Sequence, residues 1–560
     1  MFSGKFLELY LNFFHLFFYF LMSFYNIYVF LRLSDVILLN TFYDFRPELE
    51  FFPSLIRYSL KSEKWSYSSK MIIAKSTLTL HRINKTVPQI PRCMSTATIH
   101  NKRLLLKQNS GVQSLKIALV AVEVALKSVD PFLLVKNSMK LTGSELCIND
   151  VDNRSKRFDL SLFDRIYIVG AGKATAGMSE AVIQLLGGRV SGGAITIPYD
   201  ISTRRSILSI THAGHPLPDK NGLEGTKKIL SVLHNVSSND LVFVLISGGG
   251  SALMPLPMNG ITLAEKEKIT SKLLASGASI NEINVIRKHL SAIKGGRLAK
   301  ILGKGSTLIS LIMSDVVDDR IDIIASGPTA PDKSTFHDAK LVLQKYKLWN
   351  SGKFALKSVM KIIDEGIRRK IEDTPKPSDP VFKKVHNILI GSNAVACKSV
   401  FSYLNSQGIK TMYLGSSFMG KALNHGYFLH KLVDDFLPPS VPYAFVLGGE
   451  TTVELGTKIS GRGGRNHEAA LAAAVKFKSW TNKDFTILCL GTDGIDGNSN
   501  AAGAIVTPKT MSEISKQNLD LSPYLRRHDS YSLFKKLKSV IVTHKTGTNV
   551  NDISIVCRVK

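Results

Sequence analysis

Strand-length apolar runs recur along this chain, and each run ends in a short loop rich in glycine or acidic residues. Their apolar residues are continuous instead of alternating, which indicates strands covered on both faces, as in the parallel sheets of α/β proteins. Because parallel strands end at one edge of a sheet and ligands bind at that edge, we expect the loops to gather around a site. The six loops are 170–173, 247–251, 314–315, 391–393, 448–451 and 491–493.

Chain length and one proline-rich segment predict the domain organisation. At 560 residues the chain is too long for one ordinary core. We predict two α/β domains with mainly parallel sheets flanked by helices, and an active site in the cleft between them. Residues 371–384 combine three prolines with charged residues, which is typical of a connector. We therefore place the domains at 111–380 and 381–560, after an N-terminal extension at 1–110.

The charge and the cysteines narrow the class of partner. The net charge of +28 fits nucleic acid, an acidic membrane or an anionic small molecule, and residues 1–110 supply about 8 of these charges (14 basic minus 6 acidic). The other basic residues are dispersed without the basic–aromatic motifs of single-strand binders, so we expect no nucleic-acid partner. The five cysteines lack paired spacing, which argues against a disulfide framework or a zinc site and indicates a reducing compartment.

The N-terminal extension supports two competing interpretations. The uncharged run from Leu9 to Leu31 is long enough to cross a bilayer, so membrane contact stays open. From Met71 onward basic residues occur with Ser and Thr and without an acidic residue before Glu123, which is typical of a mitochondrial presequence at 71–94. We expect a mitochondrial or cytoplasmic protein, with anchoring by residues 9–31 less favoured and a basic leader without an address as the alternative. If the presequence interpretation holds, translation would start at Met71.

The first glycine loop, Gly170-Ala-Gly172-Lys173, matches neither common phosphate-binding fingerprint. A Walker A loop requires glycine where Tyr167 stands, and the dinucleotide fingerprint requires a third glycine at Thr175. What remains is a lysine at a predicted helix N-terminus, where backbone N–H groups and the helix dipole favour an anion. The alternative is an exposed lysine on a tight turn.

The second glycine loop, Ser247-Gly248-Gly249-Gly250-Ser251, allows a backbone to approach a ligand closely, because its three glycines carry no side chain. The alternative is a flexible turn. Asp315 follows the next apolar run and is either a ligand-binding carboxylate or part of a charged surface loop.

A helix expected over residues 281–293 places its isoleucines and Leu290 on one core-facing stripe. Arg287 and Lys288 lie off this stripe. Considered alone, both are expected to be solvated.

The most informative segment is Gly461-Arg-Gly-Gly-Arg465-Asn466-His467-Glu468, which is followed by Thr492-Asp493-Gly494-Ile-Asp496-Gly497. Guanidinium groups in a glycine-rich loop can hold phosphate oxygens, and two carboxylates on a tight turn can hold a divalent cation. This combination indicates phosphoryl transfer.

Taken together, the motifs resemble those of the class II glycerate kinases. The resemblance extends from about residue 114 to the C-terminus, and the motifs occur in the same order as in the family. It implies ATP-dependent phosphorylation of D-glycerate, usually to 2-phosphoglycerate, by a two-domain enzyme with magnesium in the interdomain cleft. The motifs that carry it are 170–174, 247–252, 284–291, 324–329, 461–468, 491–497 and 546–552.

The resemblance also assigns catalytic residues. Lys173 would neutralise the transferring phosphoryl oxygens, and Arg465 would bind that group or the glycerate carboxylate through two N–H groups. Asp493 would hold magnesium or accept the hydroxyl proton, and the sequence leaves both roles open. His467 stands where the family commonly has glutamine, so the hydrogen bond made there is an open point.

The predicted ligands are ATP, D-glycerate and Mg2+. The predicted metal ligands are Asp493 and Asp496. The alternatives are an NAD-dependent hydroxypyruvate reductase, which could use Gly170, Gly172 and Asp200, and a non-catalytic binding protein for phosphorylated metabolites. The sequence predicts neither oligomeric state nor nucleotide preference. The candidate binding residues are Gly170, Gly172, Ser247, Gly248, Gly249, Gly250, Ser251, Arg287, Asp315, Glu450 and Asn466.

Overall fold

A computed structural model describes residues 98–203, 206–302, 305–349, 356–436, 441–455, 461–477 and 484–559. Residues 95–560 form one compact unit. The apolar run from Leu9 to Leu31, the start at Met71 and the presequence at 71–94 lie outside the described residues and stay predictions. None of the helices in the described ranges combines the length and the apolar character that a membrane span requires.

The first large sheet contains six strands, all parallel, in the order β6-β5-β4-β7-β8-β9, as the apolar runs predict. Helices α5 (Pro131–Ser138) and α6 (Thr175–Leu186) cover one face, and α7 (Lys220–His234) and α11 (Arg297–Ile301) cover the other. All six residues of β7 are therefore buried. The strands are β4 (Ile166–Ala171), β5 (Val190–Pro198), β6 (Ser209–Ala213), β7 (Leu241–Ile246), β8 (Thr307–Met313) and β9 (Val385–Gly391).

The second large sheet has the order β10-β11-β15-β12-β13-β14, and only the pair β10 and β11 is parallel. The prediction of parallel strands is therefore wrong for this sheet. Helices α4 and α14 cover one face and α15 and α16 cover the other, and a strand buried on both faces is continuously apolar whichever way its neighbours run. The elements are β10 (Lys410–Tyr413), β11 (Tyr443–Gly449), β12 (Phe485–Gly491), β13 (Gly503–Val506), β14 (Val540–Ile541), β15 (Asp552–Arg558), α4 (Gln113–Ser128), α14 (Asn393–Ser406), α15 (Ala422–Lys431) and α16 (Arg465–Lys476).

The loops after β11 and β12 nevertheless meet at one edge. Both strands are antiparallel to the central strand β15, so they run parallel to each other. The register places Asp552, the first residue of β15, between Gly449 and Gly491, the last residues of β11 and β12. The expected gathering of loops therefore holds, with the start of β15 added to it.

The connector expected at 371–384 packs against the fold. Asp373 accepts a hydrogen bond from the His289 ring, and Glu372 pairs with Lys300. Beyond it, β9 joins the first sheet beside β8, so this sheet extends to Gly391. A domain boundary near residue 380 stays a prediction.

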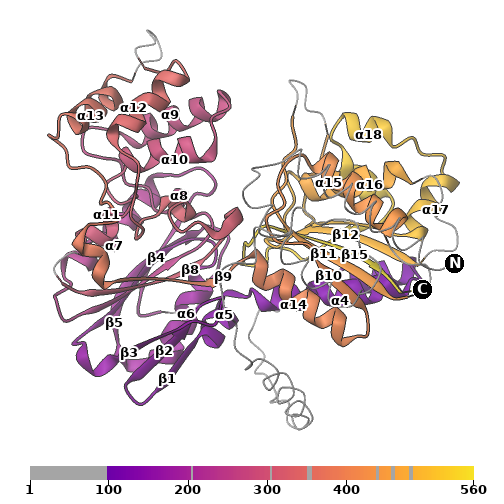
Figure 1. Ribbon diagram of the computed structural model, residues 1–560, viewed down its shortest axis with the longest axis horizontal. Coiled ribbons are helices and arrows are strands. Elements are labelled where there is room, and N and C mark those ends of the chain that lie inside the picture. The colour runs from indigo at the N-terminus through magenta and orange to yellow at the C-terminus, as the bar shows by residue number, and fades with distance from the viewer. Residues whose placement is uncertain are drawn as a thin grey trace, which may run out of the picture. The chain divides into compact units, whose positions relative to one another are not determined.

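Four helices form a separate layer with its own core: α9 (Leu263–Ala275), α10 (Ile280–His289), α12 (Phe336–Lys345) and α13 (Lys357–Ile367). Figure 1 shows them grouped near α8 (Gly250–Leu253), beyond the ends of the first sheet's strands. Helix α10 begins with a capping box of Ser279 and Glu282 and ends at His289, four residues before the predicted end at 293.

Several smaller elements complete the description. The short helix α3 lies within the predicted extension, yet its Leu105 is fully buried. A small antiparallel sheet precedes β4. These elements are α3 (Lys102–Gln108), β1 (Met139–Thr142), β2 (Glu145–Asn149), β3 (Ser155–Asp159), α17 (Pro508–Lys516), α18 (Ser522–Arg526) and α19 (Ser530–Lys536).

The close approach of β4 to β7 gives a test of the fold. A Cβ at Gly170 would lie 2.3 Å from the carbonyl oxygen of Leu245, whereas a Cβ at Gly188 has nothing within 4 Å. We expect Gly170→Ala to lower the free energy of unfolding by about 1–3 kcal/mol or more, because two backbones must separate. Gly188→Ala is the matched control. Urea unfolding that gives equal stability for the two variants would contradict this account of Gly170.

Candidate active site

The turn between β4 and α6 presents Lys173 at the edge of the first sheet. Its glycines are required by packing, because a Cβ at Gly172 would lie 2.1 Å from the Ser247 hydroxyl oxygen. That hydroxyl accepts a hydrogen bond from the Ala174 N–H at 3.0 Å, and the Lys173 N–H donates to the Gly248 carbonyl at 2.8 Å. The two glycine loops therefore fix each other and the backbone of Lys173. Direct ligand contact by Gly170, Gly172, Ser247 or Gly248 stays a prediction.

Lys173 forms an ion pair with Asp493, the residue after β12. The distance from Nζ to Oδ2 is 3.2 Å, and the two side chains are 23% and 28% exposed. The other carboxylate oxygen of Asp493 accepts the Ile495 N–H at 3.2 Å. Two of the three predicted catalytic residues, which follow strands of different sheets, are therefore in contact.

Asp315 and Glu450 add two carboxyl groups beside this pair. Asp315 follows β8, and its Oδ2 leaves no room for a Cβ at Gly248, which would lie 2.5 Å away. Burial, and then repulsion from Glu450, raises the pKa of Asp315 to about 6, while Lys173 acts in the opposite direction. A cation bound near Asp315 and Glu450 would relieve this repulsion.

Arg465, the first residue of α16, is held by two acidic residues. Its Nε and Nη2 donate to the Asp552 carboxylate at 2.5 and 3.1 Å, and its Nη1 lies 3.1 Å from Glu450 Oε1. Burial disfavours the charged guanidinium, but attraction and hydrogen bonding from Asp552 raise the pKa of Arg465 above its usual value. Arg465 is therefore an oriented and permanent cation next to Glu450.

Asp552 was missed as a candidate site residue. It is 7% exposed, and besides Arg465 it accepts a hydrogen bond from the Asn466 side chain at 2.9 Å. The motif 546–552 ends at this aspartate, so the sequence contained a signal. Without the register of β15, however, nothing in the sequence placed Asp552 beside Arg465.

Asp496 holds the N-terminus of α16. Its carboxylate accepts the backbone N–H groups of Asn466 and His467 at 3.1 and 2.8 Å, the Asn466 amide at 3.2 Å and the His467 Nδ1 at 2.5 Å. Burial raises the pKa of Asp496, but these hydrogen bonds, led by that from His467, lower it overall. His467 stands where the family commonly has glutamine, and the hydrogen bond that its ring makes there is to Asp496.

The predicted metal-ligand role of Asp496 stays a prediction. Its carboxylate is 3% exposed and already accepts these four hydrogen bonds, so it positions α16 and thereby Arg465. Within the described ranges, no three or more His, Cys, Asp or Glu side chains are grouped as a metal cage.

His215 is a second residue that the sequence analysis missed. A Cβ at Gly249, whose φ is +81°, would lie 2.7 Å from the His215 ring. Burial, and then the Lys173 ammonium, lowers the pKa of His215 to about 4, so the ring is neutral at neutral pH. Nearby Asp200 pairs with Lys545.

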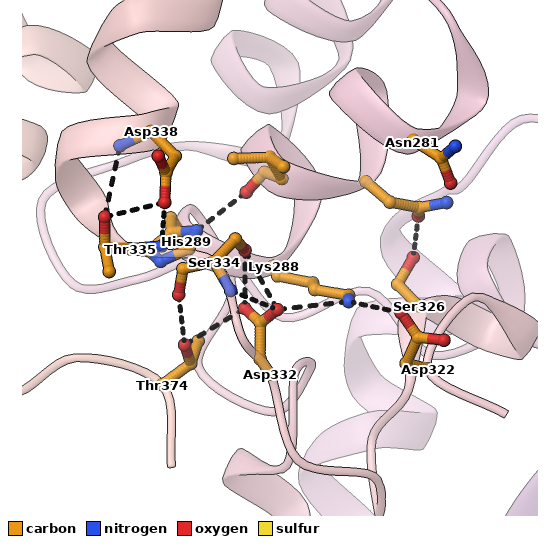
Figure 2. A network of polar contacts seen from close by, with 12 residues as sticks. Asn281, Lys288, His289, Asp322, Ser326, Asp332, Ser334, Thr335, Asp338 and Thr374 are labelled. Carbon is orange, nitrogen blue, oxygen red and sulfur yellow. Dashed lines mark hydrogen bonds and ion pairs between the residues drawn. The ribbon is translucent and has the colours of Figure 1, made fainter. Parts of the chain in front are cut away.

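Arg287 lies on α10, and within the described part of the chain it makes no hydrogen bond or ion pair with Lys173 or Asp493. Its neighbour Lys288 is not solvated, contrary to the expectation from the helix stripe. Lys288 is 4% exposed and pairs with Asp332 at 3.2 Å and Asp322 at 3.5 Å, as Figure 2 shows. Loops outside the helix supply these carboxylates, so the periodicity of the helix could not reveal them.

Comparison with known proteins identifies the family. Profiles for the "Domain of unknown function (DUF4147)" and the "MOFRL family" match residues 117–361 and 443–552. Glycerate 2-kinase of Pyrococcus horikoshii is 37% identical, over 79% of this chain and 96% of the relative. The chain belongs to the class II glycerate kinases.

Two further matches cover most of this chain, one with a solved structure and one with a sequence relative. A crystal structure of glycerate kinase from Thermotoga maritima has a TM-score of 0.67 and 35% identity, covering 79% of this chain and 99% of that one. A protein of Agrobacterium vitis that carries a provisional hydroxypyruvate reductase name is 36% identical, over 70% of this chain and 86% of its own length.

The buried carboxyl of Asp315 makes the stability of this glycerate kinase depend on pH. Because its folded pKa of about 6 exceeds the ordinary value of 3.8, its contribution to stability is present below the ordinary value and is lost as the pH rises through 6. We expect Asp315→Asn to raise the free energy of unfolding by about 1–2 kcal/mol at about pH 8, with a smaller gain at about pH 4.5.

Urea unfolding at both pH values measures this gain, with Asp318→Asn as an exposed control. A gain from Asp315→Asn that does not change with pH would contradict the assignment.

Proposed function

We propose that this protein catalyses the ATP-dependent phosphorylation of D-glycerate and forms 2-phospho-D-glycerate. The observation that carries the proposal is the contact of Lys173 with Asp493, next to carboxylates and to the fixed guanidinium of Arg465. Cations that neutralise phosphoryl oxygens, together with carboxylates that hold a metal or accept a proton, are the groups that phosphoryl transfer requires.

In the proposed reaction, the C2 hydroxyl oxygen of glycerate forms a bond to the γ-phosphorus while the bond from that phosphorus to the ADP oxygen breaks. Lys173 binds the equatorial oxygens of the transferring group, where negative charge is spread in the transition state. Arg465, held in place by Asp552, binds the same group or the glycerate carboxylate with its Nη atoms. The hydroxyl proton passes to a carboxylate, for which Asp493 is the candidate.

Magnesium fits the carboxylates of this site. Mg2+ is usually held by one or two carboxylates together with substrate phosphates and water, so Asp493 with Asp315 or Glu450 is a sufficient donor set. The raised pKa of Asp315 beside Glu450 is a second indication, because a bound cation would offset that repulsion. When bound, the metal would neutralise negative charge on the phosphate oxygens.

The reductase alternative is less favoured on structural grounds. The glycines of loop 170–173 are explained by the packing of β4 against β7, and Asp200 is engaged by Lys545. Neither feature then requires a dinucleotide. The second alternative, a non-catalytic binding protein, is disfavoured by the glycerate kinase relatives and is separated from the kinase by turnover.

Two further proposals come from the sequence alone. The protein is mitochondrial or cytoplasmic, and the mitochondrial alternative rests on the presequence at residues 71–94. The expected absence of a nucleic-acid partner rests on the dispersed basic residues.

A coupled ATP assay of the purified full chain tests the function. We expect magnesium-dependent ADP release with D-glycerate and no NADH oxidation with hydroxypyruvate. Lys173→Met should lower kcat by about 10²–10³-fold with an unchanged melting temperature, because Lys173 acts on transition-state charge. Lys116→Met, which removes an exposed lysine on α4, is the control. NADH oxidation without ADP release would reverse the proposal.

The two roles of Asp493 predict different responses of Asp493→Asn. As a metal ligand, the aspartate would be replaced by a weaker amide ligand, and the magnesium concentration for half-maximal rate should rise about tenfold. As a proton acceptor, its loss should lower kcat and leave the magnesium requirement unchanged. Magnesium titrations of the initial rate decide between these roles, and wild-type behaviour in both respects would exclude Asp493 from the site.

A further inference from the structure

Three basic side chains, one of which contacts the second glycine loop, have no acidic partner among the described residues. We call Lys266 on α9, Arg287 on α10 and Lys294 before α11 the cationic cluster. Burial lowers the pKa of all three side chains, and repulsion within the cluster further lowers the pKa of Lys266 and of Lys294. No carboxylate contributes to the electrostatics of any of the three within the described part of the chain.

Lys266 has the most unusual environment of the three. It is 7% exposed, and its Nζ atom is buried without a hydrogen-bond partner among the described residues. Burial, and then repulsion from Arg287, lowers the pKa of Lys266 to about 7. An unpaired buried ammonium is costly, so a buried lysine in this environment indicates an anionic partner that arrives from outside.

Lys294 joins the cluster to the glycine loop. Its Nζ donates to the carbonyl and the hydroxyl oxygens of Ser251 at 2.9 and 2.6 Å, and it lies 3.5 Å from the Ala325 carbonyl. All three acceptors are neutral oxygens, so none of them offsets the positive charge that Lys294 carries when it is protonated.

The same region pairs its other buried cation. Lys288, adjacent to Arg287 in sequence, is buried between Asp322 and Asp332 (Figure 2). The fold can therefore supply carboxylates to a buried lysine here, and it does not do so for the cationic cluster.

The cationic cluster and the Lys173–Asp493 ion pair both adjoin the glycine loop 247–251. The Cγ of Lys173 would lie 3.5 Å from a Cβ at Gly249, while Ser251, two residues later, binds Lys294. Two residues span at most about 7 Å, so one extended anion can reach both groups.

The loop around Ser326 contacts Ser251 and helps to hold the glycine loop in place. Its hydroxyl lies 3.1 Å from that of Ser251 and donates to the Asn284 side chain at 2.8 Å. Ala325 and Ser326 have φ values of +51° and +61°, a conformation that non-glycine residues adopt at an energetic cost. Such strain persists where surrounding contacts hold it in place.

We propose that Lys266, Arg287 and Lys294 bind the non-transferred phosphates of the nucleotide, while Lys173 binds the phosphoryl group that moves. The charge balance favours nucleotide phosphates over glycerate as the ligand of the cationic cluster. A phosphate chain carries several negative charges and can compensate three cations, whereas glycerate carries a single carboxylate. Arg287 and Ser251 are only partly buried, which leaves the cluster reachable from solvent.

This inference rests on the proposed kinase function, but its test does not require turnover. Inorganic tripolyphosphate with EDTA serves as the probe, because it presents the phosphate chain without a base, a metal or a reaction. A wild-type protein that binds tripolyphosphate through the cluster but does not phosphorylate glycerate would refute the proposed function and leave the inference standing.

The test compares Lys266→Met and Arg287→Gln with the wild-type full chain by calorimetric titration and thermal unfolding. We expect each variant to weaken tripolyphosphate binding by about 10- to 100-fold, with the dissociation constant for glycerate, measured by the same titration, changed less than about twofold. The ligand-free melting temperature of Lys266→Met should equal or exceed that of the wild type, since an unpaired buried charge has been removed.

Lys268→Met, which removes an exposed lysine from the same helix as Lys266, is the matched control. The inference is overturned if both cluster variants bind tripolyphosphate like Lys268→Met. It is also overturned if they weaken only glycerate, which would assign the cluster to the carboxylate of the acid. Arg287→Gln keeps the test decisive if Lys266→Met fails to fold.

Discussion

The two hydrogen bonds from Arg465 to Asp552 are the interaction on which the second half of the site depends. Asp552 is buried at the start of β15, and its carboxylate also binds Asn466. Removing one partner of a buried, hydrogen-bonded ion pair commonly costs about 3–5 kcal/mol, because the other charge is left unpaired. The first turn of α16, the end of β11 and the end of β12 are therefore fixed around one carboxylate, and Asp496 fixes the same turn of α16 from a second direction.

Charge is distributed unevenly around the glycine loops. On the Lys173 side, Asp315, Glu450, Asp493 and Asp552 outnumber the cations. On the Ser251 side, the basic side chains have no acidic partner within the ranges that the structure describes. Mg2+ prefers oxygen ligands and phosphate prefers cations, so the two sides have complementary requirements. A metal–nucleotide complex, which carries both kinds of charge, would satisfy both sides at once.

The sequence predicted the first sheet well, because six parallel strands with both faces covered leave a direct pattern of apolar runs and loops. It failed on the strand directions in the second sheet, where burial on both faces produces the same pattern in antiparallel strands. Local motifs identified Lys173, Arg465 and Asp493, of which Lys173 and Asp493 are in contact. They missed Asp552 and Lys266, because the importance of these residues comes from strand register and from the absence of an acidic partner, which only three-dimensional packing defines.

The position of β15 has a consequence for how the protein is made. This strand lies between β11 and β12 at the centre of its sheet, yet it follows every other strand of both sheets in sequence. A chain emerging from the ribosome can complete the first sheet early, but the second sheet lacks its middle until residues 552–558 have left the exit tunnel. Until then β11 and β12 each have an unpaired edge, and Arg465 has no Asp552 to hold it. Premature termination shortly before this strand would leave a protein with most of its mass, an open sheet and no assembled site.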